Sequence, residues 1–142
     1  KYVGASWLTK ENTGQEIDNV ISYLDKVLQA EQIPEKKNII VFGFSQGVSV
    51  ATRWLKRKKL NCSKLVLYAG GIPEELTSSD FKFLIENESE VHIIVGNTDE
   101  YLTPKRMENE AKKIEKLFHG KAHQIVFEGG HEIKKEIINA LV

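Results

Sequence analysis

The chain has 142 residues, of which 41% are hydrophobic and 28% charged, a composition typical of one globular domain. Its 20 basic and 20 acidic residues cancel, so the charge predicts neither a nucleic-acid partner nor attraction to an anionic membrane surface. No apolar run reaches the roughly 20 residues that a membrane-spanning helix needs. The single cysteine, Cys62, indicates a reducing compartment, and we therefore expect a cytoplasmic protein.

The first part of the chain predicts a helix, a strand and a second helix. Thr13-Gly14-Gln15-Glu16 has the pattern of a capping box, and the apolar spacing after it predicts a helix over about residues 14–31. The β-branched run at 38–43 predicts a strand that is buried on both faces. The second helix, over about residues 46–58, ends in the basic run 56–59. Cations suit a helix C-terminus, and the neutral net charge disfavours the alternative of a nucleic-acid patch.

The rest of the chain continues this alternation. Strands are predicted at residues 64–69, 91–95 and 123–127, and each has glycine close behind it. Helices are predicted over about residues 104–118 and 131–141. Because strands that alternate with helices form parallel βαβ units, we expect a three-layer α/β/α fold with a mainly parallel sheet. Ligand sites in such sheets lie beyond the carboxyl ends of the strands.

A nucleophile motif follows the first predicted strand. Gly43-Phe44-Ser45-Gln46-Gly47 matches G-x-S-x-G and stands directly between a strand and a helix. In that context the serine occupies a sharp turn, where its hydroxyl projects above the sheet and the helix N-terminus favours a developing oxyanion. The alternative is a glycine-rich turn in which Ser45 only caps the helix.

A serine nucleophile needs a base, and the base needs an acid that orients it. His131 follows the last strand and Asp99 follows the third, so both are expected at the same sheet edge as Ser45. The alternatives make His131 the first residue of the final helix and Asp99 a turn residue, with Glu100 as its nearest rival. The order Ser45, Asp99, His131 is that of α/β-hydrolases.

Three segments of the chain resemble the phospholipase/carboxylesterase group of α/β-hydrolases, which includes the acyl-protein thioesterases. Residues 43–47 are similar to its nucleophile elbow, residues 95–104 to its acid loop and residues 129–133 to its histidine loop. The likeness extends from about Ser6 to the end of the chain. The resemblance implies cleavage of carboxylic esters or thioesters through an acyl-enzyme, with no metal and no cofactor.

The chain departs from the group in two respects. Val48 stands where the group usually has a second glycine. The backbone N–H of Gln46 is expected to be one oxyanion donor, but no His-Gly segment that would supply the other precedes Ser45. We therefore interpret residues 1–142 as one domain that lacks N-terminal strands of the fold. Such a domain exposes a hydrophobic sheet edge, which a second copy or another partner would cover.

Apolar residues near the expected site are candidates for the substrate pocket, with ordinary core packing as the alternative for each. They are Trp7, Ile72, Tyr101 and Leu102. Histidines and cysteine do not cluster at metal-ligand spacing. The sequence thus predicts a serine esterase or thioesterase that acts on a small-molecule ester or thioester. The rival hypothesis is a non-catalytic α/β-hydrolase-like binding module, which the missing oxyanion segment favours and the order of the three residues disfavours.

Overall fold

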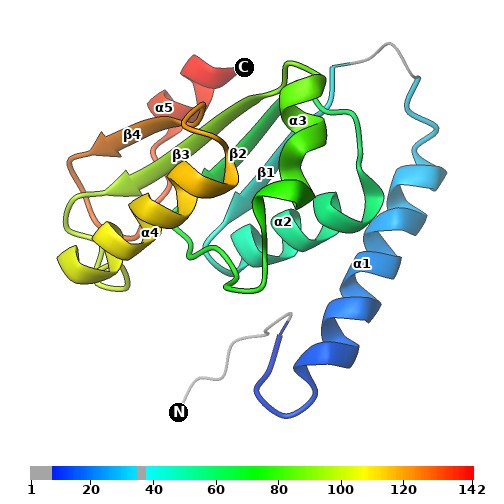
Figure 1. Cartoon of the computed structure of the whole chain (residues 1–142), viewed down its shortest axis with the longest axis horizontal. Helices are drawn as coiled ribbons and strands as arrows, with labels where there is room; N and C mark the ends of the chain where they lie inside the picture. The colour runs from blue at the N-terminus through cyan, green and yellow to red at the C-terminus, as the bar shows by residue number, and fades with distance from the viewer. Residues whose placement is uncertain (1–7, 35–37) are drawn as a thin grey trace.

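A four-stranded parallel sheet forms the centre of the computed structural model, which describes residues 8–34 and 38–142 (Figure 1). The strands lie side by side in chain order, and all three neighbouring pairs are parallel. The strands are β1 (Ile40–Phe44), β2 (Lys64–Tyr68), β3 (Glu90–Gly96) and β4 (His123–Phe127). Because every strand runs in the same direction, the segments that follow the four strands meet at one edge of the sheet.

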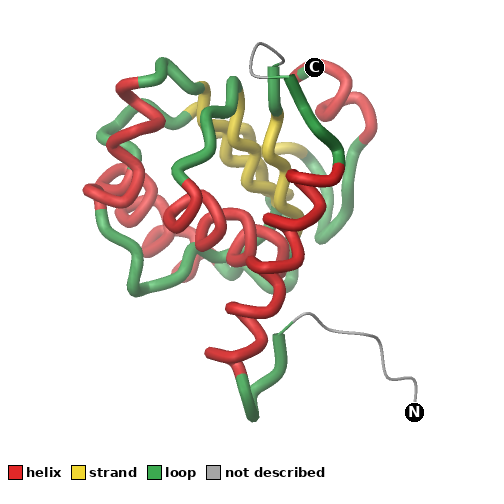
Figure 2. The backbone as a smooth tube through the Cα atoms, turned by 90° about the vertical axis from the view of Figure 1, so that its right-hand side faces the viewer, coloured by secondary structure: helices red, strands yellow, loops and turns green. Residues whose placement is uncertain are grey.

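Helices cover both faces of this sheet, as the sequence predicts. The helical elements are α1 (Thr13–Ala30), α2 (Gln46–Lys58), the 3₁₀ turn η1 (Ser78–Phe81), α3 (Lys82–Glu86), α4 (Pro104–Leu117) and α5 (Lys135–Leu141). In Figure 1, α2, α3 and α4 lie in front of the strands and α5 lies behind them. The side view in Figure 2 places the strands between these two sets of helices, so the architecture is α/β/α.

The alternation of side chains along β2 builds two cores. Leu65 and Leu67 point into the larger core, which the sheet shares with α2, α3 and α4. Val66 and Tyr68 point to the opposite face, where they pack with residues of β4 and α5. All four side chains are almost completely buried, at 2% exposure or less. A central strand covered on both faces explains why residues 64–68 are nearly all apolar.

β1 differs from the sequence prediction that both of its faces are buried. Ile40 is 39% exposed and Phe42 is 42% exposed, whereas Val41 between them is buried. β1 is an edge strand of the described sheet, and its two exposed side chains lie on the sheet face of Val66, the β2 partner of Phe42. Helix α5 packs over the side chains of β2, β3 and β4 on this face. The helices that the structure describes leave Ile40 and Phe42 of β1 partly uncovered, so both stay exposed.

The first helix begins without the predicted capping box. Asn12 is the N-cap residue of α1, and it makes no side-chain cap hydrogen bond. The Glu16 carboxylate instead accepts hydrogen bonds from the backbone N–H of Thr9 at 2.6 Å and from its hydroxyl at 2.7 Å. The hydroxyl of Thr13 donates to the Thr9 carbonyl. The prediction is wrong because the chain before the helix turns back and brings Thr9 within reach of both side chains.

The last helix begins at Lys135, four residues later than the sequence suggests. Lys134 has an extended backbone, with φ −97° and ψ 114°. Its N–H donates to the phenolic oxygen of Tyr68 at 2.9 Å. This tertiary hydrogen bond, together with the contacts of His131 described below, holds residues 131–134 as a loop. Periodicity in the sequence cannot reveal such a competing partner.

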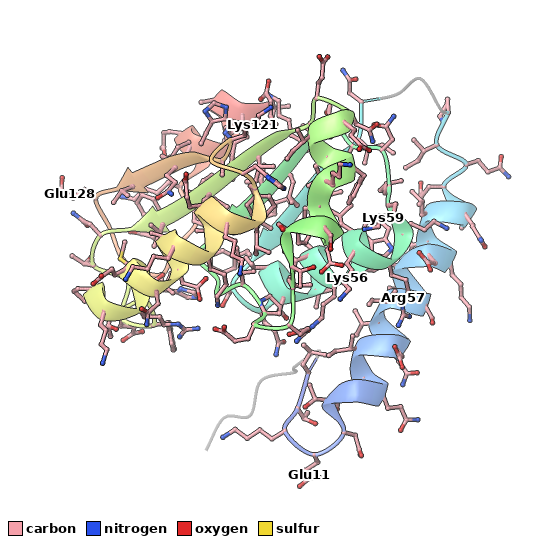
Figure 3. All side chains as sticks on the ribbon, in the orientation of Figure 1. Glu11, Lys56, Arg57, Lys59, Lys121 and Glu128 are labelled. Carbon is pink, nitrogen blue, oxygen red and sulfur yellow. The ribbon has the colours of Figure 1, made fainter. Side chains whose placement is uncertain are left out.

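The basic run lies in the last turn of α2 and just beyond it, close to α1 and η1 (Figure 3). Arg57 forms an ion pair with Asp18 of α1, and Lys56 lies 3.5 Å from the Asp80 carboxylate. Lys59 donates to the Asp80 backbone carbonyl at 2.6 Å. These cations therefore help to join α2 to its neighbours in addition to complementing the helix dipole.

Candidate active site

Ser45 occupies a strained turn between β1 and α2. Its backbone has φ 54° and ψ −119°, in the region of positive φ that residues other than glycine rarely adopt. A Cβ atom added at Gly43 would lie 2.5 Å from the backbone oxygen of Gly47, so strand and helix approach as closely as glycine permits. The Ser45 N–H donates to the Tyr68 carbonyl at 2.9 Å, and this bond fixes the turn against β2.

The turn places the Ser45 hydroxyl in a hydrogen-bonded row with two side chains from other strand ends. Ser45 Oγ lies 2.9 Å from Nε2 of His131. Nδ1 of the same imidazole lies 2.8 Å from Oδ2 of Asp99. The three residues follow β1, β4 and β3 respectively, and the shared strand direction brings them together.

The hydrogen bonds around Asp99 favour one tautomer of the His131 imidazole. The Asp99 side chain is 0% exposed, and its Oδ1 accepts the backbone N–H of Tyr101 at 2.9 Å. An ionised carboxylate only accepts hydrogen bonds, so the tautomer that fits an ionised Asp99 carries its proton on Nδ1 of His131, directed at Oδ2. Nε2 is then the acceptor for the Ser45 hydroxyl proton. This is the arrangement that a general base requires.

The loops that carry Asp99 and His131 are joined by their backbones. The N–H of Asn97 donates to the Phe127 carbonyl at 2.9 Å, and the N–H of Thr98 donates to the Gly129 carbonyl at 3.0 Å. The Asn97 side-chain oxygen accepts the N–H of Gly129 at 3.1 Å. Asn97 was not among the predicted site residues, although it directly follows Gly96, the last residue of β3, and an asparagine after a strand is a common turn signal.

Two aromatic rings flank the His131 imidazole. The Phe44 ring centroid lies 5.0 Å from it and the Tyr101 ring centroid lies 4.7 Å from it, edge-on. Tyr101 is 59% exposed, so its ring forms an outer wall beside the imidazole. Of the pocket candidates that the structure describes, Tyr101 is therefore the one whose ring lies beside the His131 imidazole. Phe44 also lies beside the imidazole but was not among the predicted pocket residues.

The other candidate residues lie elsewhere. Ile72 and Leu102 are 4% and 7% exposed and line a cavity of about 60 Å³, whose described lining includes none of the three residues of the row. Trp7 lies outside the described residues. Glu100, the rival of Asp99, is exposed to solvent. Gln46 is the first residue of α2, and its side-chain amide donates to the Leu8 carbonyl at 3.2 Å.

A groove beside the open edge of β1 reaches Ser45. Its volume is about 580 Å³, and apolar side chains of α1, β1 and α2 dominate its lining. Leu24, Phe42 and Trp54 are examples, and Ser45 and Gln46 also line the groove. The groove therefore extends from the apolar residues of α1, β1 and α2 to the residue that carries the hydroxyl.

Within residues 8–34 and 38–142, no group of three or more His, Cys, Asp and Glu side chains is placed to hold a metal ion. In the same part of the chain, every helix is too short or too polar to cross a bilayer.

The comparisons with known proteins agree with this architecture. The family model for phospholipase/carboxylesterase matches residues 6–142. Among solved structures, the chain is similar to a phospholipase/carboxylesterase from Dyadobacter fermentans, at 22% identity, with a TM-score of 0.65 over 99% of this chain and 69% of that one. It is also similar to acyl-protein thioesterase 2 from Zea mays, at 15% identity, with a TM-score of 0.66 over 96% of this chain and 67% of that one.

A carboxylesterase from Bacillus cereus is a third similar structure, at 16% identity, with a TM-score of 0.60 over 96% of this chain and 62% of that one. The chain therefore spans roughly two thirds of the length of these three structures, between 62% and 69%. No curated protein matches the sequence.

Proposed function

The chain belongs to the phospholipase/carboxylesterase family of α/β-hydrolases, and from this membership we propose that it cleaves carboxylic esters or thioesters through an acyl-enzyme on Ser45. The observation that carries the proposal is the row in which His131 contacts Ser45 at 2.9 Å and Asp99 at 2.8 Å. These are the distances that proton transfer between a nucleophile and its base requires.

In the proposed acylation step, Nε2 of His131 takes the hydroxyl proton while Ser45 Oγ attacks the carbonyl carbon of the substrate. The Asp99 carboxylate holds Nδ1–H and stabilises the imidazolium that forms. The tetrahedral oxyanion is placed near the N-terminus of α2, where the Gln46 N–H is the proposed donor and the helix dipole favours negative charge. His131 then gives its proton to the departing alcohol or thiol as the carbon–oxygen or carbon–sulfur bond breaks.

Deacylation repeats these steps with water. His131 removes a proton from a water molecule, whose oxygen attacks the acyl carbon, and it returns that proton to Ser45 Oγ as the acid leaves. Every proton in this cycle passes through Nε2, so the cycle needs neither a metal nor a redox cofactor.

A fluorophosphonate probe tests the proposal directly because it phosphonylates activated serines. The parent chain and Ser45→Ala would be treated side by side and read by intact mass. We expect one added probe on the parent and none on the variant. Hydrolysis of short and long acyl p-nitrophenyl esters and of acyl thioesters would then define the substrate. A folded parent chain that stays unlabelled would contradict the proposal and favour a non-catalytic binding module.

A further inference from the structure

Tyr68 lies beneath the proposed site as a completely buried side chain at the end of β2. Its exposure is 0%, and its ring is surrounded by other aromatic rings. The centroids of Phe42, Phe44 and Phe127 lie 6.0, 5.7 and 5.7 Å from its own. A buried tyrosine in such an apolar environment needs a partner for its hydroxyl. The partner is the backbone N–H of Lys134, at 2.9 Å.

This residue contacts the supports of both the serine and the histidine. Its backbone carbonyl accepts the N–H of Ser45 at 2.9 Å. Its phenolic oxygen accepts the N–H of Lys134, three residues after His131. The ring of Phe44, which packs against the Tyr68 ring at a tilt of 60°, also lies 5.0 Å from the imidazole, centroid to centroid. Through its backbone carbonyl and its buried side chain, Tyr68 therefore contacts both the turn that presents the nucleophile and the loop that presents the base.

We infer that Tyr68 is a positioning residue that sets the distance between His131 and Ser45. This inference rests on the proposed hydrolase function and deepens it. The hydroxyl of Tyr68 keeps Lys134 extended, so the chain stays a loop through residues 131–134 before α5 begins. Without that acceptor, the Lys134 N–H has to find another partner, and the loop moves with it. Proton transfer requires Nε2 of His131 to lie within hydrogen-bonding distance of Ser45 Oγ and in line with it. A small displacement of the imidazole therefore slows the transfer.

The test compares Tyr68→Phe with the parent chain and with Tyr23→Phe as a matched control. The first variant removes the hydroxyl but keeps the buried ring, so the protein is expected to fold. Tyr23 is a 59% exposed residue of α1 and does not belong to the row of Ser45, His131 and Asp99. For Tyr68→Phe we expect a three- to tenfold slower fluorophosphonate reaction and a lower kcat on a p-nitrophenyl ester, with KM nearly unchanged. That range is about what the loss of one buried hydrogen bond gives.

Nitrogen-15 NMR of the imidazole supplies a readout that does not depend on activity. The His131 signals, assigned by their loss in His131→Asn, report which ring nitrogen carries the proton. In the parent and in Tyr23→Phe we expect the Nδ1–H tautomer, and in Tyr68→Phe a mixture of tautomers or exchange-broadened signals. A parent that is not labelled contradicts the proposed function, and the NMR comparison still decides the role of Tyr68. Unchanged His131 signals in Tyr68→Phe overturn the inference, as does an unchanged labelling rate beside a reactive parent.

Discussion

Nε2 of His131 lies 2.9 Å from the hydroxyl oxygen of Ser45, although 86 residues separate the two in the chain. The contact depends on the sheet, because β1 and β4 are its opposite edges and two strands lie between them. Each partner sits on a short loop after its strand, and neither loop alone fixes the distance. The distance between the reacting atoms therefore depends on the contacts that support both loops.

Gly43→Ala is expected to disrupt the serine turn. The new methyl group would lie 2.5 Å from the backbone oxygen of Gly47, and backbone atoms cannot move aside as a flexible side chain can. Either β1 and α2 separate or the turn at Ser45 relaxes. We expect a lower melting temperature, a loss of about 1–3 kcal/mol in the free energy of unfolding, and at least tenfold slower labelling by a fluorophosphonate.

Gly47→Ala is the matched control, because it makes the same chemical change four residues later. A Cβ atom at this position meets no atom within 4 Å among the described residues. Alanine is also the better helix former inside α2, by roughly 0.5–1 kcal/mol. The control should therefore melt at the same or a higher temperature and label at the parental rate. If Gly43→Ala and Gly47→Ala lowered the melting temperature and the labelling rate equally, close packing at Gly43 would not be what holds the turn.

Asp99→Asn should slow acylation while leaving the fold intact. The asparagine oxygen can still accept the Tyr101 N–H, but its NH₂ group favours the wrong tautomer of His131. In serine proteases the equivalent change lowers kcat by about 10⁴-fold. We expect a loss of about 10³–10⁴-fold in labelling rate, measured by intact mass over time. Glu100→Gln is the control, since Glu100 is exposed, and it should react as the parent does. A larger loss of labelling rate in Glu100→Gln than in Asp99→Asn would identify Glu100 as the acid.

The architecture could be predicted because each strand and most helices carry strong local signals. Residues 46–58 and 123–127 have the bounds that their patterns predict. The apolar run of β2 fits its place in the fold, since β2 has a strand on each side and cores on both of its faces. The parallel order then follows from the alternation of strands and helices.

The features that the sequence could not predict depend on contacts between distant segments. Phe42 is exposed because its strand lies at the edge of the sheet. The residues of β1 alone cannot predict whether the strand lies at the edge or in the centre. α5 starts late because Tyr68 binds the N–H of Lys134, 66 residues away. Ile72 and Leu102 look like pocket residues from their place after strands, but they are buried beside α4 in the described chain.

Lys113→Met should destabilise the segment that follows β2. Nζ of Lys113 donates to the Ile72 carbonyl at 2.8 Å and lies 2.6 Å from Glu74 and 3.2 Å from Glu110. The Lys113 side chain is only 17% exposed, so the carboxylate of Glu110 would lose a partly buried partner. We expect a loss of about 1–2 kcal/mol in the free energy of unfolding by urea. Lys112→Met removes an exposed neighbour and should cost less than about 0.5 kcal/mol. An equal loss in the free energy of unfolding in the two variants would contradict a stabilising role for the contacts of Lys113.

Cys62 should resist thiol reagents until the chain unfolds. Burial raises the pKa of its thiol from 9.0 to about 11, and the residue is 2% exposed. At pH 8 the native thiol is then roughly 0.1% ionised, and the thiolate is the reactive form. Iodoacetamide at pH 8 should modify the protein in guanidinium chloride but not the native chain, as read by intact mass. Rapid modification of the native chain would contradict the burial of this thiol.

The same shift in pKa makes the stability of the fold depend on pH. The unfolded chain releases the Cys62 proton near pH 9.0, whereas the folded chain keeps it until about pH 11. The unfolded state therefore binds fewer protons in this window, and the free energy of unfolding falls as the pH rises through it. Urea denaturation at pH 8 and pH 10 measures this fall. Cys62→Ala retains the other titrating groups but lacks the thiol, so its stability should fall less between the two pH values. An identical fall in both proteins would show that the thiol does not contribute.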